Sequence, residues 1–346
     1  MQYVRLRDIC TLKQWKALPT RCFTTQGYPV YGANGIIGHY HSYNHAQPVI
    51  AVTCRGDSCG AVRITEPQAY ITANAICTEE IRADILPKYL YYYLKHTNLT
   101  PYISGAAQPQ ITQHNLGKLP IPLVPIEQQR YIAERLDKTE HIIDLSNRQL
   151  KAIDDLKNAY FSQEMEAARQ QATCREYKLG DVAHIHCGKK NASAACADGK
   201  YPFFSCAKVP SRINDYSYDC ECLLITGNID FKLTYYNGKF DAYQRTYIIE
   251  TADASLLQIP YLHACLQQYL PTLRHQAVGG VIKYIRRPML TNLCIPVPDT
   301  ATQQRIGKVS LQLQHMEQEL HTAVTQHKKL FSALLHRFFA RFTAVS

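Results

Sequence analysis

The chain repeats itself, and this repeat restricts the possible folds more than any other feature of the sequence. Tyr28-Pro-Val-Tyr recurs 173 residues later as Tyr201-Pro-Phe-Phe. Leu116-Gly-Lys-Leu-Pro-Ile-Pro recurs after 174 residues as Leu290-Thr-Asn-Leu-Cys-Ile-Pro. Because a near-constant offset between independent landmarks is hard to produce by chance, the sequence predicts a tandem duplication.

Each copy divides into a globular front part and a long helix. The front part mixes short β-type runs, such as 49–53 and 247–249, with glycine and proline punctuation. A helix is expected near its end, over 88–95 and 261–269, each after a proline suited to a first helical turn. The predicted fold class is therefore α/β (α+β), in four segments: a globular domain over 1–125, a helix over 126–173, a globular domain over 174–299 and a helix over 300–346.

Both long helices carry apolar residues at alternating spacings of four and three, the period of a coiled-coil seam. In the second copy the predicted seam is Val309, Leu313, Met316, Leu320, Ala323, His327, Leu330 and Leu334. In the first copy it is Ile132, Leu136, Thr139, Ile143, Ser146, Leu150 and Ile153. Because a whole domain separates the two helices, an antiparallel pair is favoured.

Charge and composition favour an acidic partner. The formal net charge is +10, with 38 Lys+Arg against 28 Asp+Glu. Nucleic acid is the first candidate, and a membrane surface or simple solubility is the alternative. No apolar run is long enough to span a bilayer and no secretory signal opens the chain, so we expect a cytoplasmic protein with no membrane contact. The 13 cysteines form no CxxC pair and are expected to be reduced thiols.

The sequence lacks the usual motifs of an enzyme. It contains no phosphate-binding GxxxxGK[ST] loop, no GxGxxG after a strand, no GxSxG and no HExxH. We therefore expect no catalysis and no cofactor. The one cluster that resembles a metal site is His39, His41 and His45, which we interpret as polar loop residues near a binding surface rather than as ligands.

At this point the residues resemble a known family, the specificity subunits of type I restriction–modification systems. The resemblance rests on these segments: Tyr28-Pro-Val-Tyr-Gly-Ala-Asn-Gly35, Arg55-Gly56 with Cys59-Gly60, Tyr89-Leu-Tyr-Tyr-Tyr-Leu94, Ser104-Gly-Ala-Ala-Gln-Pro-Gln-Ile-Thr112, Leu119-Pro-Ile-Pro122 and Glu127-Gln-Gln-Arg130. The same plan then repeats, so the resemblance covers nearly the whole chain. One departure is that the second copy has Gly280-Val-Ile-Lys-Tyr where the first has Ala107-Gln-Pro-Gln-Ile. Another is that the chain is short for the family and begins directly at the first recognition domain.

The resemblance implies a non-catalytic subunit of a complex for restriction and adenine-N6 methylation of DNA, a phage-defence system. Each globular part would be a target-recognition domain that reads half of a split double-stranded DNA sequence. The two helices would form an antiparallel coiled-coil spacer. The subunit would dock two methyltransferase subunits and the endonuclease/translocase subunits.

Candidate DNA-binding residues are those able to make bidentate base contacts or to hold phosphates. In the first copy they are Asn34, Arg55, Arg63, Gln108, Gln110 and Thr112. In the second copy they are Lys208, Arg212, Arg245, Lys283 and Tyr284. Each of them could instead be an ordinary surface or turn residue, Asn34 between its glycine neighbours above all.

The methyltransferase partners are expected at the start of each long helix. The candidate residues there are Gln128, Gln129, Arg130, Gln303, Gln304 and Arg305. Three other functions stay open: the specificity subunit of a fused nuclease–methyltransferase system, a coiled-coil scaffold without a DNA role, and a nuclease or methyltransferase in its own right. The DNA target cannot be read from the sequence.

Overall fold

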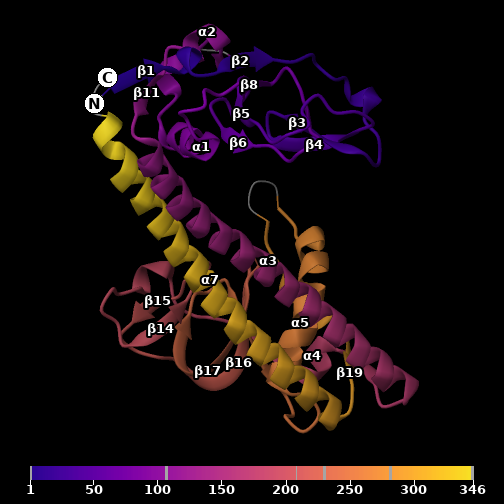
Figure 1. The fold of residues 1–346 in the computed structure, drawn as a ribbon. Helices are drawn as coiled ribbons and strands as arrows, with labels where there is room; N and C mark the ends of the chain where they lie inside the picture. The colour runs from indigo at the N-terminus through magenta and orange to yellow at the C-terminus, as the bar shows by residue number, and fades with distance from the viewer. Residues whose placement is uncertain (1, 106–107, 208, 229–230, 280–282, 344–346) are drawn as a thin grey trace. The chain divides into compact units, whose positions relative to one another are not determined.

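The computed structural model describes residues 2–105, 108–207, 209–228, 231–279 and 283–343. It consists of two units, one made of Met1–Leu145 with Val324–Ser346 and one made of Ser146–Ala323. The long helices α3 (Ile126–Gln170) and α7 (Thr300–Thr343) contribute a section to each unit (Figure 1). Each unit therefore combines one globular domain with parts of both helices, which confirms the predicted α/β fold with two long helices.

The first unit holds two main sheets and two short ladders. The four-stranded sheet has the order β2 (Thr11–Gln14), β8 (Ala75–Glu79), β5 (Ile50–Thr53), β6 (Val62–Ile64). The three-stranded sheet has the order β4 (Gly35–Tyr40), β3 (Tyr28–Gly32), β7 (Tyr70–Ile71). The two-stranded ladders are β1 (Gln2–Arg5) with β11 (Pro120–Leu123) and β9 (Ile103–Ser104) with β10 (Gln110–Ile111). The short helices are α1 (Pro87–His96), α2 (Gln113–Leu116) and the 3-10 turns Leu6–Asp8, Thr20–Cys22 and Thr100–Tyr102.

The helix expected over 88–95 is α1, and its sequence explains its place. Pro87 occupies the first turn, where a missing N–H costs nothing. Every residue from Tyr89 to Leu94 is buried, so the middle of the helix lies in the core of the domain, while Pro87, Lys88 and Lys95 at its ends are exposed. The Tyr89 hydroxyl donates a hydrogen bond to the Pro122 carbonyl (3.0 Å), which ties α1 to β11. In the same core lie Leu335 and Phe339 of α7.

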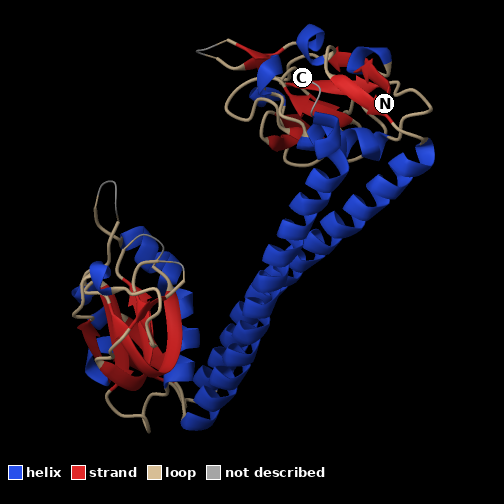
Figure 2. Cartoon of the chain, turned by 90° about the vertical axis from the view of Figure 1, so that its left-hand side faces the viewer, coloured by secondary structure: helices blue, strands red, loops and turns tan. Residues whose placement is uncertain are grey.

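The second unit has one six-stranded sheet. Its order is β13 (Ala183–Cys187), β18 (Thr246–Thr251), β16 (Tyr218–Thr226), β17 (Leu233–Ala242), β14 (Tyr201–Phe204), β15 (Ser211–Ile213). The ladder β12 (Arg175–Lys178) with β19 (Cys294–Val297) corresponds to β1 with β11. The remaining elements are α4 (Leu179–Val182), α5 (Ile259–Gln276), α6 (Arg287–Thr291) and the 3-10 turn Ala192–Ala194. Helix α5 packs on β16 and β17, and Figure 2 shows the strands with helices beside them.

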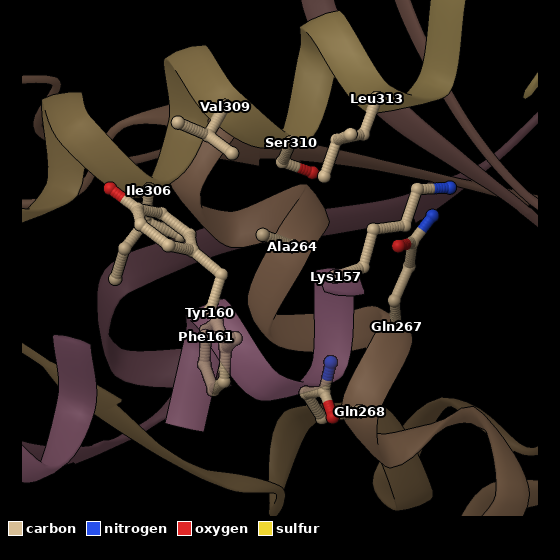
Figure 3. A pocket seen from close by; sticks show the side chains of 10 residues that line it. All are labelled: Lys157, Tyr160, Phe161, Ala264, Gln267, Gln268, Ile306, Val309, Ser310 and Leu313. Carbon is tan, nitrogen blue, oxygen red and sulfur yellow. The ribbon is translucent and has the colours of Figure 1, made fainter. Parts of the chain in front are cut away.

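The two long helices run antiparallel, as the sequence predicts. In the second unit Lys157 pairs with Glu317, and Arg305 donates to Glu164 at 2.9 Å. The residue numbers rise along α3 as they fall along α7, which fixes the direction. Next to these pairs, α5 meets both helices at a pocket lined by residues such as Phe161, Ala264 and Ile306 (Figure 3).

The predicted coiled-coil seam is right along α3 and fails at two positions along α7. On α3, six of the seven predicted positions are buried, and Leu150 is half-buried. On α7, Leu313 is buried and the predicted positions Val309, Leu320, Ala323, His327 and Leu334 are half-buried. Met316 and Leu330 are about half exposed, at 50% and 49%, so these two face outward.

Candidate nucleic-acid interface

In the first unit, one backbone carbonyl joins the turn between β3 and β4 to β5, to β6 and to the loop between them. The Ala33 carbonyl, in the turn between β3 and β4, accepts hydrogen bonds from Thr53 Oγ1, Ser58 Oγ and Arg63 Nη1, each at 3.0 Å. Ser58 Oγ also lies 2.9 Å from Asn34 Oδ1. The Asn34 turn is thus fixed to the loop that follows β5, and the Asn34 side chain stays exposed.

The loop that follows β5 is also joined to the β9–β10 hairpin. Ile111 N donates to the Cys54 carbonyl at 3.0 Å, and Arg55 forms an isolated β-bridge with Gln110. Gly56 and Gly60 have φ of +81° and +91°, a left-handed backbone that favours glycine, and they let the loop turn back at this point. Arg55 is exposed and Gln110 is half-buried. Of the predicted residues, Asn34, Arg55 and Gln110 are therefore brought to one edge of the domain.

The second unit builds the same edge from equivalent residues. Ile285 N donates to the Gly227 carbonyl at 2.8 Å, and Asn228 forms an isolated bridge with Tyr284. Gly227 N in turn donates to the Arg245 carbonyl at 2.8 Å. By these contacts, Asn228 and Tyr284 take the places that Arg55 and Gln110 have in the first copy.

A pocket of about 340 Å³ opens at this second edge. Its lining residues are Cys187, Gly227, Gln244, Arg245, Tyr247, Tyr284 and Ile285. Arg286 lies against the Tyr284 ring, with its Cζ 5.7 Å from the ring centre, and its Nη2 donates to the Tyr284 hydroxyl at 3.3 Å. Burial raises the pKa of the Cys187 thiol, and the nearby Arg287 guanidinium lowers it. The pocket thus combines aromatic faces with cationic groups, a combination that suits bases and phosphates.

Three predicted DNA-binding residues, Arg63, Thr112 and Arg212, lie away from these two edges or are held by other contacts. Arg63 is half-buried and its guanidinium is held by the Ala33 carbonyl and Thr53 Oγ1, so it supports the turn instead of facing outward. Thr112 caps α2, where its Oγ1 accepts a hydrogen bond from Asn115 N at 3.1 Å. Arg212 lies on β15, where its backbone pairs with Pro202. Lys208 is outside the described residues. Gln108 and Lys283 are exposed and lie next to the two edges in the chain.

Two predicted partner-binding residues are buried clamps, which corrects the prediction for them. Gln129 and Gln303 are each 1% exposed. Gln129 Oε1 accepts from Leu86 N, and its Nε2 donates to the carbonyls of Asp84 and Val124, all within 2.9 Å. Gln303 makes the same three contacts, with Gln258 N and the carbonyls of Leu256 and Pro298. All their amide groups are used inside the protein, so neither faces a partner.

The neighbouring candidates lie on the surface. Arg130 and Gln304 are exposed, and Gln128 is half-buried. Arg130 comes within 3.7 Å of Glu127, whereas Arg305 is held by Glu164. Arg130 is therefore held less closely by its acidic neighbour than Arg305 is.

Sequence reasoning missed residues at both kinds of surface. It passed over Arg286 and Arg287, although the run Lys283-Tyr284-Ile285-Arg286-Arg287 is visibly basic. It also placed Met316 inside the helix pair. Met316 instead faces outward with Leu156, in a groove of about 520 Å³ on the second unit. An apolar residue one step from a seam has the same sequence signature as a seam residue, so no local signal separates the two.

Comparison with known proteins agrees with this architecture. The family model described as "Type I restriction modification DNA specificity domain" matches residues 1–155 and again 172–326. The chain belongs to this family. It is 34% identical over 144 residues to the EcoDI specificity subunit of a type I restriction enzyme from Escherichia coli, and 32% identical over 111 residues to the EcoprrI specificity subunit from the same species. These matches cover 42% and 32% of this chain, and 32% and 27% of those proteins.

A solved structure shares the fold over nearly the whole length. The crystal structure of a type I restriction-modification system S subunit from M. genitalium superposes with a TM-score of 0.80, covering 98% of this chain and 96% of that one. The two sequences are 16% identical, so this match concerns the fold alone. Among the described residues, no helix combines the length and apolar character needed to cross a membrane.

Proposed function

We propose that this chain is the DNA sequence-specificity subunit of a type I restriction–modification complex and that it is not itself catalytic. Its two globular domains each read one half of a bipartite target in double-stranded DNA. The observation that carries the proposal is the repeated edge, in which Arg55 with Gln110 and Asn228 with Tyr284 occupy equivalent places. Membership of the DNA specificity family supports it.

The exposed residues divide between reading bases and holding phosphates. Arg55 and Gln110 have the planar donor groups that make bidentate contacts with guanine or adenine in the major groove. In the second copy, Arg245 and Tyr284 line the pocket and take the corresponding task. Arg286, Arg287 and Lys283 supply positive charge beside the pocket and contact the backbone.

The half-site assignment is tested by binding variants to a randomised duplex library. Arg55→Ala should relax the first half-site alone, and Arg245→Ala the second alone, each by about 1–3 kcal/mol of discrimination. Lys13→Ala removes a cation elsewhere in the first domain and is the matched control. Loss of both half-sites together from either variant would mean that the edges do not read separate sequences.

Methyltransferase docking is assigned to the outer face of the helix pair. In the second unit this face carries a groove lined by Ala152 and Leu156 of α3 and Met316, Leu320 and Ala323 of α7, among others. Leu156 is 52% exposed and Met316 is 50% exposed. An exposed apolar groove between two helices suits an amphipathic helix of a partner subunit. Arg130 and Gln304 add polar contacts at the helix starts.

The docking assignment predicts the composition of the complex. Two similar helix starts related by the duplication should recruit two methyltransferase subunits per chain, and the endonuclease/translocase subunits join the resulting complex. Met316→Lys should abolish or weaken capture of a co-expressed methyltransferase subunit, whereas Gln318→Lys, on the exposed side of the same helix, should not. Equal capture by both variants would place the contact elsewhere.

The decisive experiment on function is mapping of N6-methyladenine across the host genome with this gene intact and deleted. Loss of one bipartite motif on deletion is the expected result, and it would also supply the target. If no motif disappears while the methyltransferase is expressed, the specificity role is wrong.

An insertion of seven residues in both helices should lengthen the spacer between the half-sites and leave both half-sites unchanged.

A further inference from the structure

The polar cluster around Glu79, at the end of β8, is unrelated to the DNA-reading edge. Glu79 Oε1 accepts a hydrogen bond from Trp15 Nε1 at 2.7 Å and lies 3.1 Å from His45 Nε2. Cys77 lies on the same face of the strand, two residues earlier. One ligand atom from each of His45, Cys77 and Glu79 falls within 4.8 Å of the other two.

The hydrogen bonds of Asn44 fix the protonation of the His45 ring. Asn44 Nδ2 donates to the Ile71 carbonyl at 2.9 Å, and Asn44 Oδ1 accepts from Ile71 N at 2.8 Å. The amide orientation is therefore set, and its oxygen is the atom that lies 2.8 Å from His45 Nδ1. Because that oxygen only accepts, Nδ1 carries the proton. A neutral His45 then directs the lone pair of Nε2 at the Glu79 carboxylate.

Two acceptors that face each other at 3.1 Å need a cation between or beside them. The His45 side chain is 9% exposed and Cys77 is fully buried. A metal-binding histidine usually donates its other ring N–H to an oxygen acceptor, and the Asn44 amide oxygen is such an acceptor here.

From this geometry we propose that His45 Nε2, Cys77 Sγ and a Glu79 carboxylate oxygen bind one zinc ion. A nitrogen, a thiolate and a carboxylate are the ligand types that zinc prefers. On binding, the Cys77 thiol releases its proton to solvent and the sulfur binds as thiolate. The fourth position is left for water from the adjoining pocket of about 640 Å³, which is lined by Trp15, His45 and Glu79, among others.

Lys13, a cation that already lies beside the cluster, can move away from it. Lys13 Nζ lies 3.6 Å from Glu79 Oε2 and 3.9 Å from the centre of the Trp15 ring. Its side chain is 46% exposed, so it can turn into solvent when the metal takes its place. Trp15 stays and orients the carboxylate through its N–H.

The second copy lacks the cysteine of this cluster. Ala51 of β5 faces Cys77, and Leu224 of β16, which is equivalent to Ala51, faces Ile248. The positions of Cys77 and Glu79 are therefore Ile248 and Glu250 in the second copy, and the isoleucine offers no ligand atom for zinc. The metal would link the loop that carries His45 to the sheet of the first domain.

Cobalt titration of the metal-stripped full chain tests the proposal. One Co²⁺ per chain should give a near-ultraviolet thiolate-to-cobalt band, and zinc should abolish the band by competition. Cys77→Ala should lose the band, and His45→Gln should weaken binding at least 10-fold. Trp15→Phe, which removes only the orienting N–H, should weaken binding about 10-fold.

Matched variants keep the outcome decisive. Cys265→Ala, which removes a buried cysteine of the second copy, and His39→Gln, which removes an exposed histidine, should bind as the unaltered chain does. Circular dichroism of each variant checks that it is folded. A band that survives Cys77→Ala, or the absence of any tight binding in the unaltered chain, would overturn the site and leave a proton shared by His45 and Glu79.

Discussion

Helices α1 and α5 are equivalent elements of the two copies, and their sequences differ where they face the long helices. Tyr89 and Tyr261 have the same role, since each donates a hydrogen bond to a proline carbonyl in the strand before the long helix, Pro122 of β11 or Pro296 of β19. Two residues further on, the first copy has Tyr91 and the second has His263. The duplication therefore preserves the contact with the sheet and varies the contact with the helix pair.

The two copies also place their charges differently at this contact. In the first unit, Lys95 of α1 donates to Glu140 of α3 at 2.6 Å and to the Tyr91 hydroxyl at 2.9 Å. In the second unit, the cation is Lys157 of α3, paired with Glu317 of α7, and its side chain is only 8% exposed. Figure 3 shows Lys157 beside Gln267 of α5. The ion pair therefore joins α1 to α3 in the first copy and α3 to α7 in the second.

The glutamine clamps should give the largest effect and should be equal in both copies. Gln129→Leu removes three hydrogen bonds and leaves buried backbone groups without partners, at about 1–3 kcal/mol each. We expect a loss of at least about 3 kcal/mol in the free energy of unfolding, and the same for Gln303→Leu. Urea denaturation followed by circular dichroism measures both. Gln304→Leu, on the surface, should change stability by less than about 0.5 kcal/mol, and a clamp variant that behaved like it would break the comparison.

The buried His263 should make the second copy sensitive to acid. Burial, with the charge of Lys157 as a lesser cause, lowers the pKa of His263 from 6.5 to about 4. The unfolded chain takes up this proton first, so the stabilisation is complete above pH 6.5 and is lost as the pH falls toward 4. The full loss is about 3 kcal/mol.

Unfolding free energies at pH 7.5 and pH 5 test this. The unaltered chain should lose more stability between them than His263→Gln does, by about 2 kcal/mol. Tyr91 in the first copy does not titrate in this range, so Tyr91→Phe should leave the pH dependence unchanged. An identical pH dependence in the unaltered chain and His263→Gln would show that the ring is not buried in neutral form.

The register of α7 predicts opposite outcomes for two neighbouring apolar residues. Leu313 is 8% exposed, so Leu313→Ala should cost about 2–3 kcal/mol. Met316 is half exposed, so Met316→Ala should cost less than about 0.5 kcal/mol. Thermal unfolding of the two variants distinguishes them. Equal losses of stability would mean that Leu313 and Met316 both lie in the seam, as the sequence predicts.

A small effect is expected where the two sheets differ. Strand β17 runs unbroken from Leu233 to Ala242, whereas the corresponding stretch of the first copy is interrupted between β6 and β7. Gln68 in that interruption has a φ of +54°, so Gln68→Gly should stabilise the chain by about 0.5 kcal/mol. Glu66→Gly, at an exposed position without a positive φ, should not stabilise it.

Much of the fold could be predicted because it follows from patterns repeated along the chain. The duplication, α1, the long helices and their antiparallel pairing all rest on periodicity or on residues such as Pro87. The seam of α7 failed at Met316 and Leu330, because these apolar residues keep the predicted period and yet face outward. The interruption between β6 and β7 contains Pro67, which cannot donate to a ladder, yet its effect on the sheet depends on strands far away in sequence.

The candidate sites were predicted less well, because their geometry depends on distant backbone. Asn34, Arg55 and Gln110, which were single candidates in the sequence, lie at one edge of the first domain. Arg63 looks the same in sequence, but the Ala33 carbonyl turns it inward. The sequence groups His45 with His39 and His41, whereas in the structure its neighbours are Cys77 and Glu79 of β8. Gln129 lies in a polar motif that is typical of a surface, yet its side chain is buried. It is held there by the carbonyls of Asp84 and Val124, which the local sequence does not show.

The paired strands β1 and β11, and likewise β12 and β19, mean that each globular domain begins and ends at one place. The chain enters and leaves through a single antiparallel ladder beside the start of a long helix. A foreign domain joined at these two strands would leave the length and phase of both helices untouched. Under the proposed function, such an exchange would change one half-site and leave the spacing between the two half-sites unchanged.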